Sequence, residues 1–161
     1  MLISIIAAVS ENNVIGNKSS IPWLIKNDLK RFKNLTLGKC LIMGHKTFNS
    51  IKKELTGRKV IVLSTQKNLN YTNCFIANSI NEVIELCIND NEIFIAGGGQ
   101  IYSQFINIAH KIYLTRVHTF IQGDTFFPEI NQSEWEIVEQ QYFNADKDNE
   151  YPYSFITYIK K

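Results

Sequence analysis

One carboxylate stands out because of its neighbours. Asp28 lies within Lys26 to Leu35, where the apolar residues Leu29, Phe32 and Leu35 recur at helical spacing. A carboxylate beside an apolar helix face can bind a cationic or amidine-like group of a ligand. It can equally be a first-turn acid that interacts with the helix dipole. The spacing alone leaves both interpretations open.

Two glycine-containing junctions are candidates for binding phosphate. Apolar Ile93 to Ala96 leads into Gly97 to Gly99, and apolar Leu41 to Met43 leads into Gly44 to Thr47. Glycines let a backbone approach a diphosphate, and a following helix offers amides to the anion. The Rossmann pattern is not met, because Tyr102 stands where its third glycine belongs. The first junction favours an anion site over plain turn glycines, and both together could hold the two halves of a dinucleotide.

The remaining candidates are more ambiguous. Arg58 is either a surface residue or the fork that binds a substrate carboxylate. The segment from Val14 to Trp23 follows the first strand and is placed to cover a pocket. Gly123 to Pro128 reads as a turn. His110 and His118 lack metal-ligand spacing, so we predict no metal site.

Alternating elements must position these residues. Short apolar runs without period-2 alternation predict strands covered on both faces, at Leu2 to Val9, Lys39 to Met43, Val60 to Leu63, Cys74 to Ala77, Ile93 to Ala96 and Ile112 to Val117. Helical spacing predicts helices between them, at Lys26 to Leu35, Thr47 to Leu55, Asn81 to Asn89 and Gln100 to Ala109, with Ile101, Phe105 and Ile108 sharing one face.

The end of the chain has a different pattern. Trp135 to Phe143 and Tyr151 to Ile159 are extended candidates joined by a polar segment, which predicts an antiparallel hairpin. We therefore expect an α/β fold with a mostly parallel central sheet of about eight strands and flanking crossover helices. We expect residues 1–161 to form a single domain.

Composition narrows the class of protein. Hydrophobic residues make up 45% of the 161 residues and charged residues 20%, which is typical of a globular protein. The net charge of +2 is too small to indicate nucleic acid binding. No apolar stretch reaches the roughly 20 residues of a membrane span, and the apolar start reads as a buried strand. The 3 cysteines show no C-x-x-C spacing, so we expect neither a disulfide framework nor a zinc site, and a cytoplasmic location.

Taken together, these residues resemble the dihydrofolate reductase family from Ile3 to the C-terminal hairpin. The resemblance depends on the order and spacing of several motifs, none of them diagnostic alone. They are Ile15-Gly16, Ile21-Pro22-Trp23, Asp28 with Phe32, Ile42-Met43-Gly44, Gly57-Arg58-Lys59, Ala96 to Gly99 with Tyr102, Leu114-Thr115, Gly123-Asp124-Thr125 and Phe127-Pro128.

The resemblance implies NADPH-dependent reduction of dihydrofolate to tetrahydrofolate, with hydride transfer to pterin C6 and protonation at N5. Asp28 would hydrogen-bond the pterin 2-amino group and N3, and Thr115 would bridge to it. Arg58 would clamp the glutamate carboxylate, and a water near Ile21 and Trp23 would supply the proton. The substrate pocket would be formed by Ile6, Ala8, Leu29, Phe32, Ile51, Leu55, Ala96 and Tyr102.

The same resemblance implies that NADPH runs across the sheet, with its nicotinamide near Ala8, Ile15 and Gly16. The rest of the cofactor would contact Gly44, His45, Lys46, Thr47, Leu63, Ser64, Thr65, Gly97, Gly98, Gly99, Gln100, Ile101 and Tyr102. The adenosine 2′-phosphate would lie near His45, Thr65 and Gln100. The family also carries a cis peptide bond at the position of Gly97-Gly98.

The chain departs from the family pattern at a few positions. His45 and Gln100 stand where relatives often carry arginine, so less fixed positive charge faces the 2′-phosphate, and we expect Lys46 to compensate. Ile21 is a conservative change in the covering loop. Ala96 is smaller than the residue in some relatives and should leave more room beside the substrate ring.

Two other functions are compatible with parts of this pattern. One is a riboflavin-pathway reductase of the same fold, which resembles this chain in the glycine motif without Pro22-Trp23, Asp28 and Arg58. The other is a non-catalytic nucleotide-binding module, against which Asp28, Trp23 and Thr115 argue. We expect a cytoplasmic monomer of one-carbon metabolism and tetrahydrofolate biosynthesis, an antifolate target without nucleic acid or membrane partners. Burial should raise the pKa of Asp28, so hydride transfer should slow as pH rises.

Overall fold

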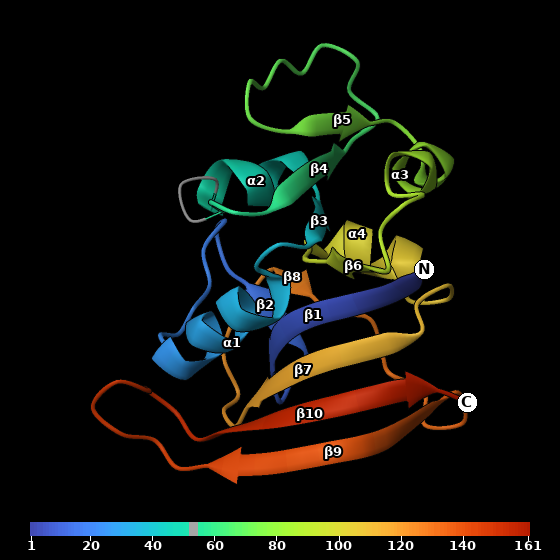
Figure 1. Cartoon of the computed structure of the whole chain (residues 1–161). Helices are drawn as coiled ribbons and strands as arrows, with labels where there is room; N and C mark the ends of the chain where they lie inside the picture. The colour runs from blue at the N-terminus through green and yellow to red at the C-terminus, as the bar shows by residue number, and fades with distance from the viewer. Residues whose placement is uncertain (52–54) are drawn as a thin grey trace.

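An eight-stranded sheet forms the centre of the computed structural model, which describes residues 1–51 and 55–161. The strand order is β5-β4-β3-β6-β1-β7-β10-β9 (Figure 1). The strands are β1 (Leu2–Ser10), β3 (Cys40–Met43), β4 (Lys59–Leu63), β5 (Phe75–Ala77), β6 (Glu92–Ile95), β7 (Lys111–Val117), β9 (Trp135–Phe143) and β10 (Tyr153–Lys160). The pairs from β5 to β7 are all parallel, and β10 runs antiparallel to both β7 and β9. This confirms the expected sheet and its C-terminal hairpin.

Four helices among the described residues cover the two faces of the sheet. They are α1 (Lys26–Thr36), α2 (His45–Ile51), α3 (Ile80–Leu86) and α4 (Gly99–Phe105). Phe32 of α1 and Phe48 of α2 pack on one face, while Val83 of α3 and Phe105 of α4 pack on the other. With apolar layers on both faces, the parallel strands need the near-continuous Ile and Val runs that the sequence contains.

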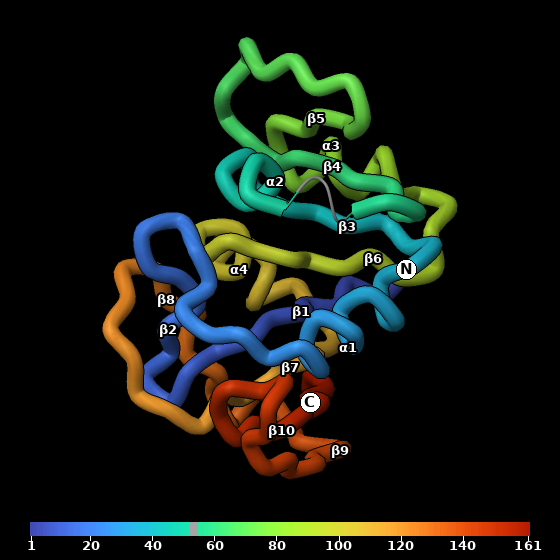
Figure 2. Tube along the Cα trace, turned by 90° about the vertical axis from the view of Figure 1, so that its left-hand side faces the viewer, coloured from blue at the N-terminus to red at the C-terminus, as the bar shows by residue number. Residues whose placement is uncertain are grey.

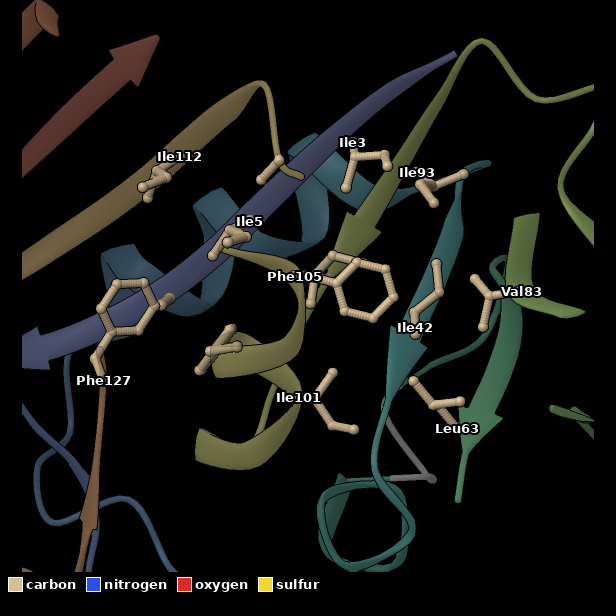
Figure 3. Close-up of a cluster of buried hydrophobic side chains, with 14 of the residues drawn as sticks. Ile3, Ile5, Ile42, Leu63, Val83, Ile93, Ile101, Phe105, Ile112 and Phe127 are labelled. Carbon is tan, nitrogen blue, oxygen red and sulfur yellow. The ribbon is translucent and has the colours of Figure 1, made fainter. Parts of the chain in front are cut away.

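The core on the α3 and α4 face is dense (Figure 3). Ile5 of β1, Ile42 of β3 and Ile93 of β6 converge with Ile101 and Phe105 of α4. Apart from Ile101 these side chains have no exposed surface. This packing fixes α4 against the sheet.

Some predicted helix ends were wrong. The helix expected at Gln100 to Ala109 ends at Phe105, and Ile108 is 40% exposed because the chain turns there to enter β7. The helix expected at Asn81 to Asn89 ends at Leu86. Helix α2 starts before the expected Thr47 and is described to Ile51. Residues 52–54 lie outside the described part, and Leu55 is not helical.

A small second sheet was not predicted from the sequence. Strand β2 (Val14–Gly16) pairs antiparallel with β8 (Thr125–Phe126), so part of the segment read as a turn is a strand. A two-residue strand has no periodicity to detect. Its partner lies more than a hundred residues away in the sequence.

This small sheet lies beside the carboxyl end of β1, where the Val14 N–H donates to Ser10 Oγ, and beside Gly99, which follows β6. In Figure 2 the segment between β2 and α1 lies on the same side of the molecule as β8 and α4. The carboxyl ends of parallel strands are where open α/β sheets bind ligands. No helix among the described residues is long and apolar enough to cross a membrane.

Candidate active site

The first turn of α1 places Asp28 against strand β7. The Thr115 hydroxyl donates a hydrogen bond to Asp28 Oδ1 at 2.6 Å. Thr115 is only 1% exposed, and a buried hydroxyl requires such a partner. The structure thus brings together two predicted site residues that lie 87 positions apart.

The surroundings of Asp28 favour its neutral form. Burial raises the pKa of the Asp28 carboxyl, while the Thr115 hydrogen bond and the charge of Arg31 oppose this shift. A buried carboxyl with a raised pKa can bind a cationic or amidine-like group and can take part in proton exchange. The structure therefore favours the ligand-binding interpretation of Asp28 over that of a solvated first-turn acid.

Arg31 is a neighbour that sequence analysis did not single out. Its Nη1 donates to the Leu114 carbonyl at 3.1 Å, and its guanidinium lies 4.4 Å from the centre of the Phe155 ring. It therefore joins the Asp28 helix to β7 and β10. Its position three residues after Asp28 was the available signal, because such residues share a helix face.

Most of the predicted pocket residues surround one apolar region. Leu55 and Ile6 are buried, and Phe32, Ile51 and Ala96 pack against the same cluster. Ala8 packs beside Trp23 on the neighbouring cluster. Leu29 is 47% exposed, so it covers the edge of the region and not its interior.

Arg58 also lies beside this region. Its guanidinium carbon is 5.8 Å from the centre of the Phe32 ring. Its Nε is buried and has no hydrogen-bond partner among the described residues. Burial lowers the pKa of Arg58. A partly desolvated arginine fork beside an aromatic ring is suited to binding a carboxylate.

The two glycine junctions meet through their backbones. The Gly44 N–H donates to the Gly97 carbonyl at 2.9 Å. The Gly97-Gly98 peptide bond is cis, as the resemblance implied, and Gly97 has φ +110°. A Cβ at Gly97 would lie 3.2 Å from the Tyr102 hydroxyl, and one at Gly98 would lie 3.4 Å from Thr47 Oγ1. At Gly97 a Cβ would require Tyr102 to shift and would hold a strained positive φ, whereas the contact at Gly98 is close to an ordinary one.

Tyr102 fixes this junction to the sheet. Its hydroxyl donates to the Ile6 carbonyl at 2.8 Å. Burial raises the pKa of Tyr102, and the charge of Asp28 adds to this shift, so the phenol stays a donor. Tyr102 therefore joins the glycine junction to a strand of the substrate region. Ile101 is buried beneath it, with a side-chain carbon 3.4 Å from a Cβ built at Gly44.

The predicted 2′-phosphate residues lie at the outer end of the glycine junctions. His45 Nδ1 is 3.5 Å from Ser64 Oγ, which joins the start of α2 to the end of β4. Lys46, Thr65 and Gln100 are exposed, while Leu63 is buried and anchors the end of the strand. Helices α2 and α4 have 7 residues each, so backbone approach and side chains matter more here than a helix dipole.

These features fit a dinucleotide cofactor. The junctions around Gly44 and Gly97 present backbone without side chains, as close approach of a diphosphate requires. The exposed Lys46 beside His45 can meet a further phosphate. Residues Gly44 to Thr47, Ser64, Thr65 and Gly97 to Gln100 could therefore hold the cofactor.

The loop expected to cover the site is anchored by a distant segment. Asp124 Oδ2 accepts from the Lys18 N–H at 3.0 Å, and the Asp124 N–H donates to the Gly16 carbonyl at 3.1 Å. The hydrogen bond from Lys18, followed by that from the Thr125 hydroxyl, lowers the pKa of Asp124. A Cβ at Gly123 would lie 2.2 Å from Val14. Sequence analysis missed this anchor, for which the Gly-Asp-Thr motif was the only signal.

Two predicted site residues at the end of the covering loop differ in their exposure to solvent. Ile21 is 53% exposed, whereas Trp23 is only 8% exposed. Trp23 Nε1 is buried and has no hydrogen-bond partner within residues 1–51 and 55–161. It is thus a donor available to a water or ligand. Ile15 and Gly16 are half-buried at the start of the loop.

Known proteins share this arrangement over its whole length. The family model described as dihydrofolate reductase matches residues 2–160. The curated dihydrofolate reductase of Haemophilus influenzae is 39% identical and covers 100% of both chains. That of Bacillus subtilis is 37% identical over 99% of this chain and 95% of its own length. That of Buchnera aphidicola is 46% identical over 86% of this chain and 84% of its own.

A solved structure agrees with these relatives. Dihydrofolate reductase from Enterococcus faecalis, complexed with NADP(H) and RAB-propyl, superimposes with a TM-score of 0.92 and 31% identity. The match covers 99% of this chain and 96% of the other. The chain belongs to the dihydrofolate reductase family.

Proposed function

We propose that Asp28 and Thr115 are the substrate anchor of an NADPH-dependent reductase of dihydrofolate. As a member of its family, this chain reduces dihydrofolate to tetrahydrofolate, with a hydride added to pterin C6 and a proton to N5. The observation that carries the assignment of the anchor is the hydrogen bond of 2.6 Å from Thr115 to Asp28. It leaves Asp28 Oδ2 to accept from the pterin 2-amino group and N3.

The remaining substrate contacts follow from the apolar region. Phe32, Ile51 and Leu55 hold the pterin and benzoyl rings, and the neighbouring Ile6 and Ala96 close the sides of the pocket. Arg58 binds the glutamate carboxylate, because its guanidinium is partly desolvated beside Phe32. Together these contacts fix the ring relative to the carboxyl ends of the strands.

The cofactor half of the site depends on backbone. When bound, NADPH supplies the hydride. Gly97 to Gly99 and Gly44 to Thr47 hold its diphosphate, Ala8, Ile15 and Gly16 adjoin its nicotinamide, and His45, Lys46, Thr65 and Gln100 face its 2′-phosphate. Their role is to orient two rings face to face and to exclude water from between them.

Proton delivery uses the neutral form of Asp28 and a water. N5 lies on the far side of the pterin ring from Asp28, so direct transfer is not required. A water held near Trp23 Nε1 and Ile21 donates to N5, and protonated Asp28 stabilises the ring tautomer that accepts this proton. The rate of the chemical step therefore falls as pH rises through the raised pKa of Asp28.

Broader properties are also proposed. The chain acts as one domain and as a monomer in the cytoplasm, and the free state of all 3 cysteines supports a reducing compartment. Its net charge of +2 supports small-molecule ligands over nucleic acid. Size-exclusion chromatography with light scattering tests the monomer, and a dimer mass would contradict it.

The direct test follows NADPH absorbance with dihydrofolate, repeated with NADH. We expect fast dihydrofolate-dependent loss of absorbance with NADPH and slower loss with NADH. The difference between the two rates should be smaller in Lys46→Gln, because this variant loses the positive charge that faces the 2′-phosphate. Folded protein that consumes NADPH only with a ribosylated aminopyrimidine would establish the riboflavin-pathway alternative. Folded protein that binds NADPH without turning over either substrate would establish a non-catalytic module.

A further inference from the structure

Two cysteines that are 47 positions apart meet at the opposite end of the sheet from the site. Cys40 begins β3, and Cys87 follows the last residue of α3. Their sulfur atoms lie 3.2 Å apart, and the two residues are 1% and 0% exposed. Both are free thiols in the structure. Because β3 reaches the candidate site at its carboxyl end, Cys40 at its amino end takes no part in that site.

A charged group lies next to the thiols. Lys59 Nζ is 3.3 Å from Asp90 Oδ2 and also donates to the Leu86 carbonyl. The side chains of Lys59 and Asp90 are 34% and 31% exposed, so solvent lies one layer from the sulfurs. The cluster therefore lies near the surface, at the end of a short helix.

The two thiols are not equivalent. The hydrogen bond between the two thiols, together with the charge of Lys59, lowers the pKa of Cys87 against the effect of burial. The same hydrogen bond and burial raise the pKa of Cys40. Cys87, at the end of α3, is thus the more readily ionised of the two thiols, as an attacking nucleophile must be.

We propose that Cys40 and Cys87 are a redox-sensitive dithiol that forms an intramolecular disulfide by exchange with a small disulfide such as oxidised glutathione. The thiolate of Cys87 attacks the glutathione disulfide, which forms a mixed disulfide and releases one reduced glutathione. The thiolate of Cys40 then attacks Cys87 sulfur and releases the second. Two thiols are oxidised, one glutathione disulfide is reduced, and the two protons leave on the glutathione thiols.

The geometry favours this pairing over the other possibilities. Cys74 packs against the α1 and α2 face of the sheet, whereas Cys40 and Cys87 belong to the core of the other face. Cys74 therefore cannot reach either of them without unfolding. Asp90 lies close enough to both sulfurs to suggest a metal site, within 4.8 Å, but the Lys59 ammonium already pairs with Asp90 and would repel a cation.

The test counts thiols in a variant that contains only the proposed pair. Cys74→Ser protein is equilibrated, in the presence of a metal chelator, in glutathione buffers with increasing ratios of oxidised to reduced glutathione. The reaction is then quenched with acid, the protein is unfolded and its free thiols are alkylated. Mass spectrometry gives the mass of the chain. We expect both thiols to disappear together, with a mass about 2 Da below that of the reduced chain and no bound glutathione. Peptide mapping should identify the Cys40 to Cys87 link.

Two controls distinguish whether the two sulfurs can form a disulfide in this fold from whether glutathione can reach them. Refolding the reduced variant in the same buffers exposes both sulfurs, so slow opening of α3 cannot hide the reaction. The double variants Cys74→Ser with Cys40→Ser or with Cys87→Ser should lose no mass. The proposal is overturned if refolded protein keeps both thiols in the most oxidising buffer, if either sulfur only binds glutathione, or if the reduced variant retains zinc without a chelator.

Discussion

The two halves of the candidate site are built from different chemical groups. On the substrate side, the contacts come from side chains, with Thr115 Oγ1 bonded to Asp28 and Arg58 beside Phe32. On the cofactor side, the two glycine junctions are joined by backbone atoms, the Gly44 N–H and the Gly97 carbonyl. Ligand binding in the substrate half should therefore be most sensitive to the loss of a side-chain group. Binding in the cofactor half should be most sensitive to a side chain added at a glycine.

This difference has a physical origin. A pterin presents a fixed pattern of donors that one carboxylate can match, and a buried match discriminates strongly against wrong ligands. A diphosphate is symmetric and charged, so any set of amides that can approach it closely will bind it. Side-chain identity thus matters at Asp28, whereas the absence of a side chain matters at Gly97.

The largest effect should come from Asp28→Asn, which tests the substrate half. The variant keeps the size of the side chain but has no acidic proton and one acceptor oxygen fewer, so kcat/KM for dihydrofolate should fall by about 10²- to 10⁴-fold. Affinity for NADPH should stay within about twofold. Stopped-flow kinetics and fluorescence titration measure the two values. Glu136→Gln, on the exposed strand β9, is the matched loss of one carboxylate and should change neither.

The next effect should come from Gly97→Ala, which tests the cofactor half. The new methyl would lie 3.2 Å from the Tyr102 hydroxyl at φ +110°, and we expect a cost of about 1–3 kcal/mol in unfolding free energy. NADPH affinity should fall more than dihydrofolate affinity. Urea denaturation and cofactor titration provide the measurements.

Gly38→Ala is the matched control for this change. Gly38 also has a positive φ, of +76°, but a Cβ there meets no atom within 4 Å. It should therefore lose stability without losing NADPH affinity. Equal loss of cofactor affinity in both variants would show that the contact at Gly97 is unimportant.

A smaller effect is expected for Thr115→Val. The change removes the donor to Asp28 at nearly constant volume, and dihydrofolate affinity should weaken about tenfold. Because this hydrogen bond lowers the pKa of Asp28, its loss should move the pH midpoint of the chemical step upward. Thr157→Val removes a buried hydroxyl on the neighbouring strand β10 and should leave that midpoint unchanged. A midpoint that stays in place in Thr115→Val would exclude Asp28 as the titrating group.

The smallest effect concerns stability and pH. Burial raises the pKa of Asp28, so the folded state binds its proton more tightly than the unfolded state does. The stabilisation this gives is present below the ordinary pKa of about 3.9 and is lost as pH rises through the folded value. Relative to Asp28→Asn, the wild-type chain should therefore become less stable as pH rises. Urea unfolding of both proteins across this range measures the difference, and a constant difference would contradict it.

Sequence analysis predicted the parts of the fold that depend on local pattern. The apolar runs predicted the six parallel strands, and the extended C-terminal segments predicted β9 and β10, each within two residues of its observed ends. Helix ends were less predictable, since α4 stops at Phe105 where the chain must turn toward β7. Strand β10 of the hairpin begins at Tyr153, two residues later than expected.

The tertiary structure decided the contacts between distant segments. The β2 and β8 pairing, the Asp124 anchor of the covering loop and the Cys40 and Cys87 pair have no local pattern that predicts them. Three cysteines without regular spacing indicated no site, yet the crossover through α3 places two sulfurs 3.2 Å apart.

The sequence alone thus determined which residues could form the site, because glycine, carboxylate and arginine chemistry is carried by residue type and short spacing. The order of the Asp28, Gly97 and Thr115 motifs was enough to indicate the family. Only the tertiary structure decided that Thr115 meets Asp28 and that Gly44 meets Gly97. Those distances arise from strand order and register, which depend on packing across the whole sheet and are not encoded in any local segment.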